Sequence, residues 1–165
     1  MENPDLVDIV GYEGLYKFDK VKNQVFGIKR NRYLTNSLDK DGYYTVSLFK
    51  NAKIKILKNH RLSYMCNNPT EDISEYQIDH IDGNPQNNNI NNLRKCFQSD
   101  NQSNRKTNKN NKLGIKYIIK SESGYRFQLR KNKISYRKRF KNLQDAIEYR
   151  DIKVKEINGE FANLG

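Results

Sequence analysis

Several residue types are scarce in this chain of 165 residues, and their scarcity excludes whole classes of protein. The two cysteines, Cys66 and Cys96, form no Cys-x-x-Cys pair, which excludes a disulfide framework and a zinc ribbon. No apolar run approaches the roughly 18 residues of a membrane-spanning helix, and the first residues lack the pattern of a secretory signal. The sequence therefore predicts a cytoplasmic protein without membrane association.

Apolar residues are also few, at 35% of the chain, and tryptophan is absent. So polar a chain favours small modules over one large core, because each module has little apolar surface to bury. Eleven tyrosines and seven phenylalanines nevertheless suffice for small cores, so disorder is not expected.

The formal net charge is +12, and it is distributed unevenly along the chain. Residues 1–76 carry +2, residues 77–104 carry −1, and residues 105–165 carry +11. A basic excess gathered at one end indicates a polyanionic partner, and double-stranded DNA is the expected one. The alternative is a solvated basic face that serves only solubility.

The first two thirds of the sequence predict short strands, turns and two short helices. Strands are expected over residues 11–18, 24–29, 42–49 and 53–57, and they predict a small antiparallel sheet. One or two helical turns are expected over residues 60–66. In the middle of the chain we expect a strand over residues 76–80, a loop over 82–89 and a second strand over 92–94. A polar helix is expected to begin at Ser99.

The last segment has the clearest periodicity. Residues 125–130 alternate, which predicts an apolar strand face and a polar one. The apolar face comprises Tyr125, Phe127, Leu129, Ile134, Tyr136 and Phe140. The polar face comprises Arg126, Gln128, Arg130, Arg137 and Arg139, which we expect to contact DNA. A further strand over 114–119 and a helix from Asn142 to Gly159 complete a sheet backed by one helix.

These elements predict an α+β protein built of small modules. We expect an N-terminal β-rich module over residues 1–58 and a central segment of two strands and a helix over 59–104. A linker over 105–112 and a C-terminal sheet module over 113–165 follow.

Histidine chemistry is confined to His60 and His80, because the chain has no other histidine. His80 offers a base that works near neutral pH, and Asp79 and Asn101 offer oxygen ligands. Hard oxygen ligands suit Mg²⁺, with Mn²⁺ as a substitute. Asp79 and His80 are adjacent, however, so they point to opposite faces of a regular strand unless the chain bends there or the substrate lies at the strand edge.

The central segment resembles the HNH homing endonucleases of phages and introns. The residues that carry the resemblance are Asp79-His80, Asp82-Gly83-Asn84, Asn87-Asn88, Asn92-Leu93-Arg94 and Asn101. The resemblance implies that His80 is the general base, that Asp79 and Asn101 bind the metal, and that Asn92 braces the loop that holds the histidine. Upstream, Gly11–Tyr16, Asp41-Gly42-Tyr43 and His60-Arg61-Leu62 resemble the modular domain associated with such nucleases.

Three residues near this motif have two interpretations each. Arg94 either braces the loop or contacts DNA. Asn104 lies one helical turn beyond Asn101 and either supports the ligands or contacts a phosphate. His60 is either structural, packing beneath the sheet or holding the start of the helix, or it contacts a phosphate.

The C-terminal segment resembles the plant ethylene-response-factor (AP2) type of DNA-binding domain. The resemblance is carried by Gly114-Ile115, Gly124–Phe127, Arg139-Phe140, Asp145-Ala146, Tyr149–Asp151, Asn158-Gly159 and Phe161–Asn163. It implies a three-stranded sheet that enters the major groove, with a helix behind it. Tyr125 departs from the pattern, because the family usually has tryptophan there.

Together these patterns predict a metal-dependent HNH DNA endonuclease that needs no small-molecule cofactor. One catalytic motif predicts that a monomer nicks one strand, and the resemblance implies 5′-phosphate and 3′-hydroxyl ends at a specific double-stranded site. The alternative is a sequence-specific DNA-binding regulator with a vestigial nuclease motif. An RNA-directed nuclease is disfavoured, because the groove of A-form RNA is too narrow for such a sheet.

Overall fold

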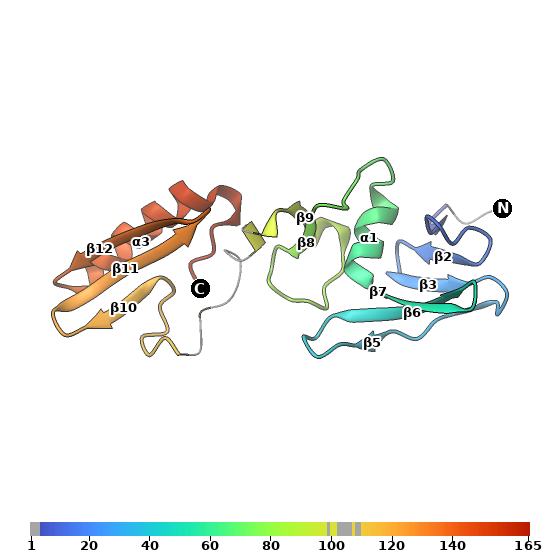
Figure 1. The fold of residues 1–165 in the computed structure, drawn as a ribbon, viewed down its shortest axis with the longest axis horizontal. Coiled ribbons are helices and arrows are strands. Elements are labelled where there is room, and N and C mark those ends of the chain that lie inside the picture. Colours follow the sequence, from blue (N-terminus) through green and yellow to red (C-terminus); the bar gives the residue numbers. More distant parts are fainter. Residues whose placement is uncertain (1–3, 99, 102–106, 108–109) are drawn as a thin grey trace. The chain divides into compact units, whose positions relative to one another are not determined.

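The computed structural model describes residues 4–98, 100–101, 107 and 110–165. The chain divides into two compact units, Met1–Cys96 and Phe97–Gly165. Both combine small antiparallel sheets with helical segments (Figure 1), which confirms the predicted α+β class. Within the described ranges, no helix is both long and apolar enough to cross a membrane.

The N-terminal strands form two antiparallel sheets, where the sequence analysis expected one. The four-stranded sheet contains β1 (Leu6–Asp8), β2 (Tyr16–Asp19), β3 (Gln24–Gly27) and β4 (Arg32–Tyr33). The three-stranded sheet contains β5 (Ser37–Leu38), β6 (Tyr44–Lys50) and β7 (Lys53–Lys58). Local patterns identify strands, but which strands pair depends on contacts between distant residues, so the number of sheets was not predictable.

The strand predicted over residues 11–18 is wrong in its first half. β2 begins only at Tyr16. Gly11 and Gly14 have φ angles of 81° and 71°, which is left-handed backbone that an extended strand does not contain. The glycines therefore place turns where strand was expected.

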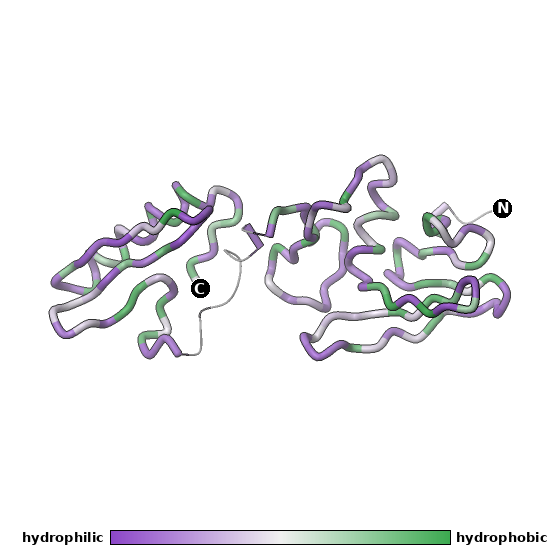
Figure 2. Tube along the Cα trace, in the orientation of Figure 1, coloured by the Kyte–Doolittle hydropathy of each residue, from purple (hydrophilic) through white to green (hydrophobic). Residues whose placement is uncertain are grey.

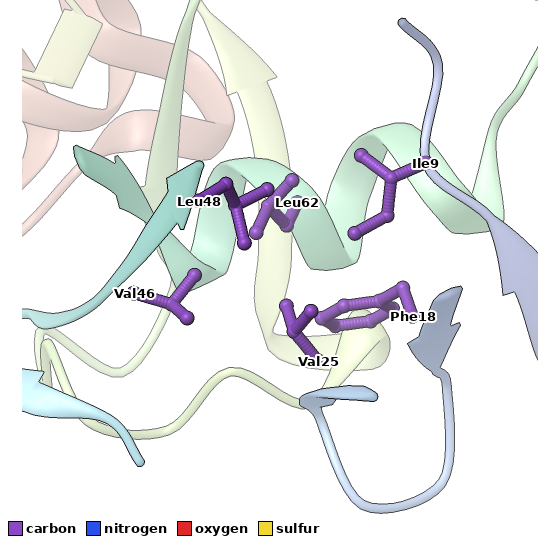
Figure 3. Close-up of a cluster of buried hydrophobic side chains, with 6 residues drawn as sticks. All are labelled: Ile9, Phe18, Val25, Val46, Leu48 and Leu62. Atoms are coloured by element: carbon purple, nitrogen blue, oxygen red, sulfur yellow. The ribbon is translucent and has the colours of Figure 1, made fainter. Parts of the chain in front are cut away.

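Helix α1 (Asn59–Asn67) connects two apolar clusters within the first unit. Its Leu62 packs into the cluster formed with the two sheets (Figure 3), which comprises Ile9, Phe18, Val25, Val46, Leu48 and Leu62. Its Tyr64 belongs to the next cluster, which comprises Tyr64, Ile73, Ile78 and Leu93. Burial of these side chains holds α1 between the N-terminal sheets and the hairpin that follows.

That hairpin consists of β8 (Gln77–His80) and β9 (Leu93–Cys96), with the short 3₁₀ helix η1 (Ile90–Asn92) before β9. The strands pair antiparallel, with Asp79 opposite Arg94 and His80 opposite Leu93. The expected order of strand, loop and strand is present. Of the expected polar helix, residues 98, 100 and 101 are helical, whereas Ser99 and Asn104 lie outside the described residues.

The second unit is a three-stranded antiparallel sheet packed on one helix, as predicted. Its elements are β10 (Ile118–Ser121), β11 (Gly124–Lys131), β12 (Ile134–Phe140), α3 (Leu143–Asn158) and the 3₁₀ helix η2 (Gly159–Phe161). The Asn142 side chain accepts from the Asp145 N–H and caps α3, and Gly159 with φ of 55° ends it. Phe127, Leu129 and Val154 form the core.

Two expectations for this unit need correction. The strand predicted over 114–119 begins only at Ile118, because Tyr117 has a φ of 65° and the Asn111 amide holds a turn by donating to the Ile115 and Ile118 carbonyls. Ile134, expected on the buried face, is 56% exposed. It begins β12 beside the turn, where the apolar cluster no longer covers the strand.

Candidate active site and nucleic-acid interface

His80 lies at the end of β8 and is 4% exposed. Its Nε2 is 3.0 Å from Oδ1 of Asn88, which is itself buried. With the amide oxygen facing the ring, Nε2 carries the proton and Nδ1 carries the lone pair of the neutral imidazole. Asn88 therefore selects the tautomer in which Nδ1 is the basic atom.

Asn88 contacts His80 although no site role was predicted for it from the sequence. Its backbone carbonyl accepts from the Ser63 hydroxyl at 3.0 Å, so α1 fixes the segment that holds the histidine. The only sequence signal for it was membership of the Asn87-Asn88 pair in the motif. Nothing in that pair indicates which asparagine meets the imidazole.

Asn92 links both ends of the loop between the two strands. Its Nδ2 donates to Oδ1 of Asp82 at 3.0 Å and to the carbonyl of Asn87 at 2.8 Å, while its Oδ1 accepts from the Asp82 N–H at 3.1 Å. Burial alone would raise the pKa of Asp82, but hydrogen bonds from the Asn84 N–H and from the Asn87 and Asn92 amides outweigh it and lower the pKa. The loop that carries Asn88 is thus braced through Asn92.

Asp79 is 6% exposed and faces Arg94 across the hairpin. Nε and Nη2 of Arg94 donate to Oδ2 of Asp79 at 3.0 and 2.9 Å. The two adjacent residues thus contact different partners, Arg94 for Asp79 and Asn88 for His80. The strand ends at His80, and the Gly83 N–H donates to its carbonyl at 3.0 Å, so the chain turns directly after the histidine.

The remaining predicted site residues fall elsewhere. Asn101 belongs to the second unit, where its N–H donates to the Phe97 carbonyl at 3.1 Å. Asn104 lies outside the described residues. Asp79, His80, Asn92 and Arg94 therefore come together in the first unit, and Asn101 does not belong to it. No group of three or more His, Cys, Asp or Glu side chains that could hold a metal occurs among the described residues.

His60, near the start of α1, packs against His80. The ring centroids are 5.0 Å apart, and His60 is 6% exposed. Burial, followed by the neighbouring His80, lowers the pKa of His60 from 6.5 to about 3. Its Nδ1 is buried without a hydrogen-bond partner. This position agrees with packing rather than with contact to a phosphate in solvent.

The pKa of His60 predicts that stability falls as the pH is lowered. Below about pH 6.5 the unfolded chain binds a proton on His60 that the folded chain does not accept until about pH 3, so acid favours unfolding. From about pH 7 to about pH 5 the loss due to His60 approaches about 2 kcal/mol in the free energy of unfolding. Urea titrations of the parent and of His60→Phe measure it. Equal pH dependence in the two proteins would contradict the assignment.

The outer face of the C-terminal sheet carries the predicted arginines. Arg126 is paired with Arg139, Gln128 with Arg137, and Arg130 with Ser135. Lys138, between two of these arginines, points to the other face, with Nζ 4.3 Å from the Tyr149 ring centroid. Figure 2 shows β11 and β12 coloured mainly as hydrophilic.

These arginines lie close together without compensation. None of Arg126, Arg130, Arg137 and Arg139 forms an ion pair with a carboxylate in the part of the chain that the structure describes. Like charges directly opposite on neighbouring strands destabilise a sheet. The face is therefore suited to an anionic partner that neutralises it.

Comparison with known proteins identifies the central segment. Residues 58–103 match the family model of HNH endonucleases. DNA endonuclease I-HmuI of Bacillus phage SP01 is 39% identical over 89 residues, which are 53% of this chain and 49% of that protein. Uncharacterized HNH endonuclease L245 of Acanthamoeba polyphaga mimivirus is 40% identical over 78 residues, which are 47% of this chain and 23% of that protein.

The fold agrees with this similarity. A solved structure that describes DNA binding and cleavage by the HNH homing endonuclease I-HmuI has a TM-score of 0.55, at 27% sequence identity, covering 95% of this chain and 89% of that one. The chain spans about half, or less, of the curated relatives that it matches. It carries an HNH endonuclease domain at residues 58–103 and is homologous to the phage homing endonuclease I-HmuI.

Proposed function

We propose that this protein is a metal-dependent endonuclease that hydrolyses a phosphodiester bond at a specific site in double-stranded DNA. The observation that carries the proposal is the buried His80 imidazole, held by Asn88 on a loop braced by Asn92, inside the segment that matches the HNH endonucleases. The relative I-HmuI is named a DNA endonuclease.

In this proposal His80 is the general base. Nδ1 takes a proton from the attacking water, because Asn88 keeps the proton of the neutral ring on Nε2. Asn92 acts through the loop, since its amide fixes Asp82 and Asn87 on either side of the turn. Catalysis of this kind needs an imidazole whose direction is set before the substrate arrives.

Asp79 and Asn101 would hold the metal, with Mg²⁺ expected and Mn²⁺ as a substitute. Their donor set fits, because a carboxylate and an amide carbonyl are the hard oxygen ligands that Mg²⁺ prefers. A carboxylate has two oxygens and several lone pairs. Asp79 can therefore accept hydrogen bonds from Arg94 and bind a cation at the same time. When bound, the cation supplies positive charge that stabilises the phosphate and the leaving oxygen. Arg94 then orients a ligand, and a direct contact with DNA stays a prediction.

The C-terminal sheet is proposed as the DNA-binding module, as its resemblance to the ethylene-response-factor domains implies. Arg126, Gln128, Arg130, Arg137 and Arg139 would face the DNA. The linker over 105–112, the module boundaries and a contact of Asn104 with DNA stay predictions. So do nicking of one strand by a monomer and the formation of 5′-phosphate and 3′-hydroxyl ends. Action in the cytoplasm of a host cell is likewise a prediction.

The test is cleavage of DNA fragments that span the region flanking the gene. With Mg²⁺ or Mn²⁺ we expect one strand to be cut at a defined position, seen on denaturing gels while native gels show intact duplex. With EDTA, cleavage should stop while gel-shift binding persists. Binding without cleavage in either metal would contradict the proposal and support the DNA-binding regulator instead.

A further inference from the structure

Tyr43 reaches the candidate active site from outside the segment that matches the HNH endonucleases, residues 58–103. It ends the turn between β5 and β6. Oδ1 of Asp39 accepts from the N–H groups of Asp41 and Tyr43, both at 2.9 Å, and the Gly42 N–H donates to the Asp39 carbonyl at 3.0 Å. Gly42 has a φ of 84°, as such a turn requires. The turn is thus closed on itself and presents Tyr43 in one direction.

The Tyr43 ring packs against both histidines of the chain. Its centroid is 5.1 Å from that of His60 and 5.8 Å from that of His80, and the two histidines are 5.0 Å apart. These separations lie within the range in which ring pairs attract one another. Nζ of Lys58 lies 4.0 Å from the Tyr43 centroid, so a cation also packs on this ring.

The same turn also lies beside the loop that carries Asn88. A Cβ atom on Gly42 would stand 3.6 Å from Cγ of Pro85, which is ordinary van der Waals contact. Pro85 and Asn88 belong to the loop braced by Asn92. The turn that presents Tyr43 therefore lies beside both features that orient His80, the packed rings and the loop that carries Asn88.

A hydrogen bond at one nitrogen does not by itself set the orientation of an imidazole ring. The contact with Asn88 sets where Nε2 points, but the ring can still rotate about that direction, because its terminal torsion has broad minima. Two rings packed against its side limit this rotation. His60 contributes one of them from α1 and Tyr43 the other from the turn before β6.

We propose that Tyr43 is a positioning residue for His80, acting directly and through His60, so that the N-terminal sheets complete the catalytic site of the HNH domain. The inference rests on the proposed function, in which Nδ1 of His80 takes the proton from water. A base held by a hydrogen bond and two rings stays aligned with its water. Without the Tyr43 ring, the base samples more unproductive orientations.

Kinetics of the full chain test this proposal with three variants. Tyr43→Ala should lower kcat by about 10-fold to 100-fold, because small losses of alignment are costly, while KM and the DNA affinity in EDTA change by less than about 3-fold. Tyr43→Phe keeps the ring and should stay within about 3-fold of the parent. Tyr44→Ala, at the adjacent strand position, is the matched control. If Tyr43→Ala does not fold, Tyr43→Leu fills the space without a ring and should show the same loss.

Nitrogen NMR of the metal-free chain gives a readout that does not depend on cleavage. The chain has only two histidines, so a His60→Gln spectrum assigns both imidazoles. In the parent, His80 should show sharp signals of the tautomer protonated on Nε2. In Tyr43→Ala or Tyr43→Leu the signals of that tautomer should shift and broaden, because the ring then samples several orientations. Unchanged His80 signals together with an unchanged kcat would overturn the proposal. A parent that cuts no DNA would overturn the proposed function instead, while the His80 spectrum would still decide whether Tyr43 positions the ring.

Discussion

Replacing His80 with alanine should reduce the rate of DNA cleavage by about 10²-fold to 10⁴-fold, which is the range supplied by general bases. His80 is one of only two histidines in the chain, and the other is excluded as the base by its position. His60 is buried against His80 with a pKa near 3, so it does not accept a proton at neutral pH. The measurement is single-turnover cleavage of the mapped site with Mg²⁺.

The control for this variant is the binding step. DNA affinity in EDTA should stay close to that of the parent, because the proposed DNA-binding arginines lie in the second unit. Free imidazole added to His80→Ala should restore part of the cleavage rate, which a structural role of the ring would not allow. If His80→Ala cuts as fast as the parent, His80 is not the base.

Elements with strong local periodicity were predictable from the sequence. The alternation around Phe127 and Leu129 predicted a strand with one buried face, and both residues are buried in the core of the second unit. The caps of α3 at Asn142 and Gly159 were equally local, because an asparagine side chain and a flexible glycine act within a few residues of their own position.

Elements whose shape depends on a single backbone angle or on distant pairing were not predictable. Apolar residues before Ile118 favoured a strand, but Tyr117 adopts left-handed backbone, a conformation that tyrosine rarely takes. The contacts that impose it come from the Asn111 side chain. The strand-forming tendency of single residues does not include a hydrogen bond from a side chain several residues away, so this turn was not predictable.

The residues of the candidate site were also only partly predictable from the sequence. The order and spacing of Asp79, His80 and Asn92 singled these residues out, because the motif is compact in sequence. Asn88 and Tyr43 were not assigned, although both contact His80. The position of Tyr43 in particular follows from folding of the N-terminal sheets against α1, which brings together residues that are distant along the chain.

Removing the four arginines of the outer sheet face should have the second large effect. The variant Arg126→Ala, Arg130→Ala, Arg137→Ala and Arg139→Ala is expected to bind DNA about 10²-fold to 10⁴-fold more weakly. Each arginine that neutralises a phosphate contributes about 0.9 to the slope of log affinity against log salt concentration, so the slope should fall by up to about 4. Affinities measured in EDTA over a range of salt concentrations give both quantities.

A matched pair of double variants separates contact with DNA from total charge. Arg137→Ala with Arg139→Ala removes two charges from the exposed sheet face, whereas Lys153→Ala with Lys155→Ala removes two from α3. If the sheet binds DNA, the first pair should lower the salt slope by about 2 and the second should change it little. Arginines that read bases would instead relax sequence preference at their own positions, because base contacts carry the specificity. An equal fall of the salt slope in both double variants would mean that only the total charge of the chain matters for DNA affinity. The C-terminal sheet would then not be the DNA-binding surface.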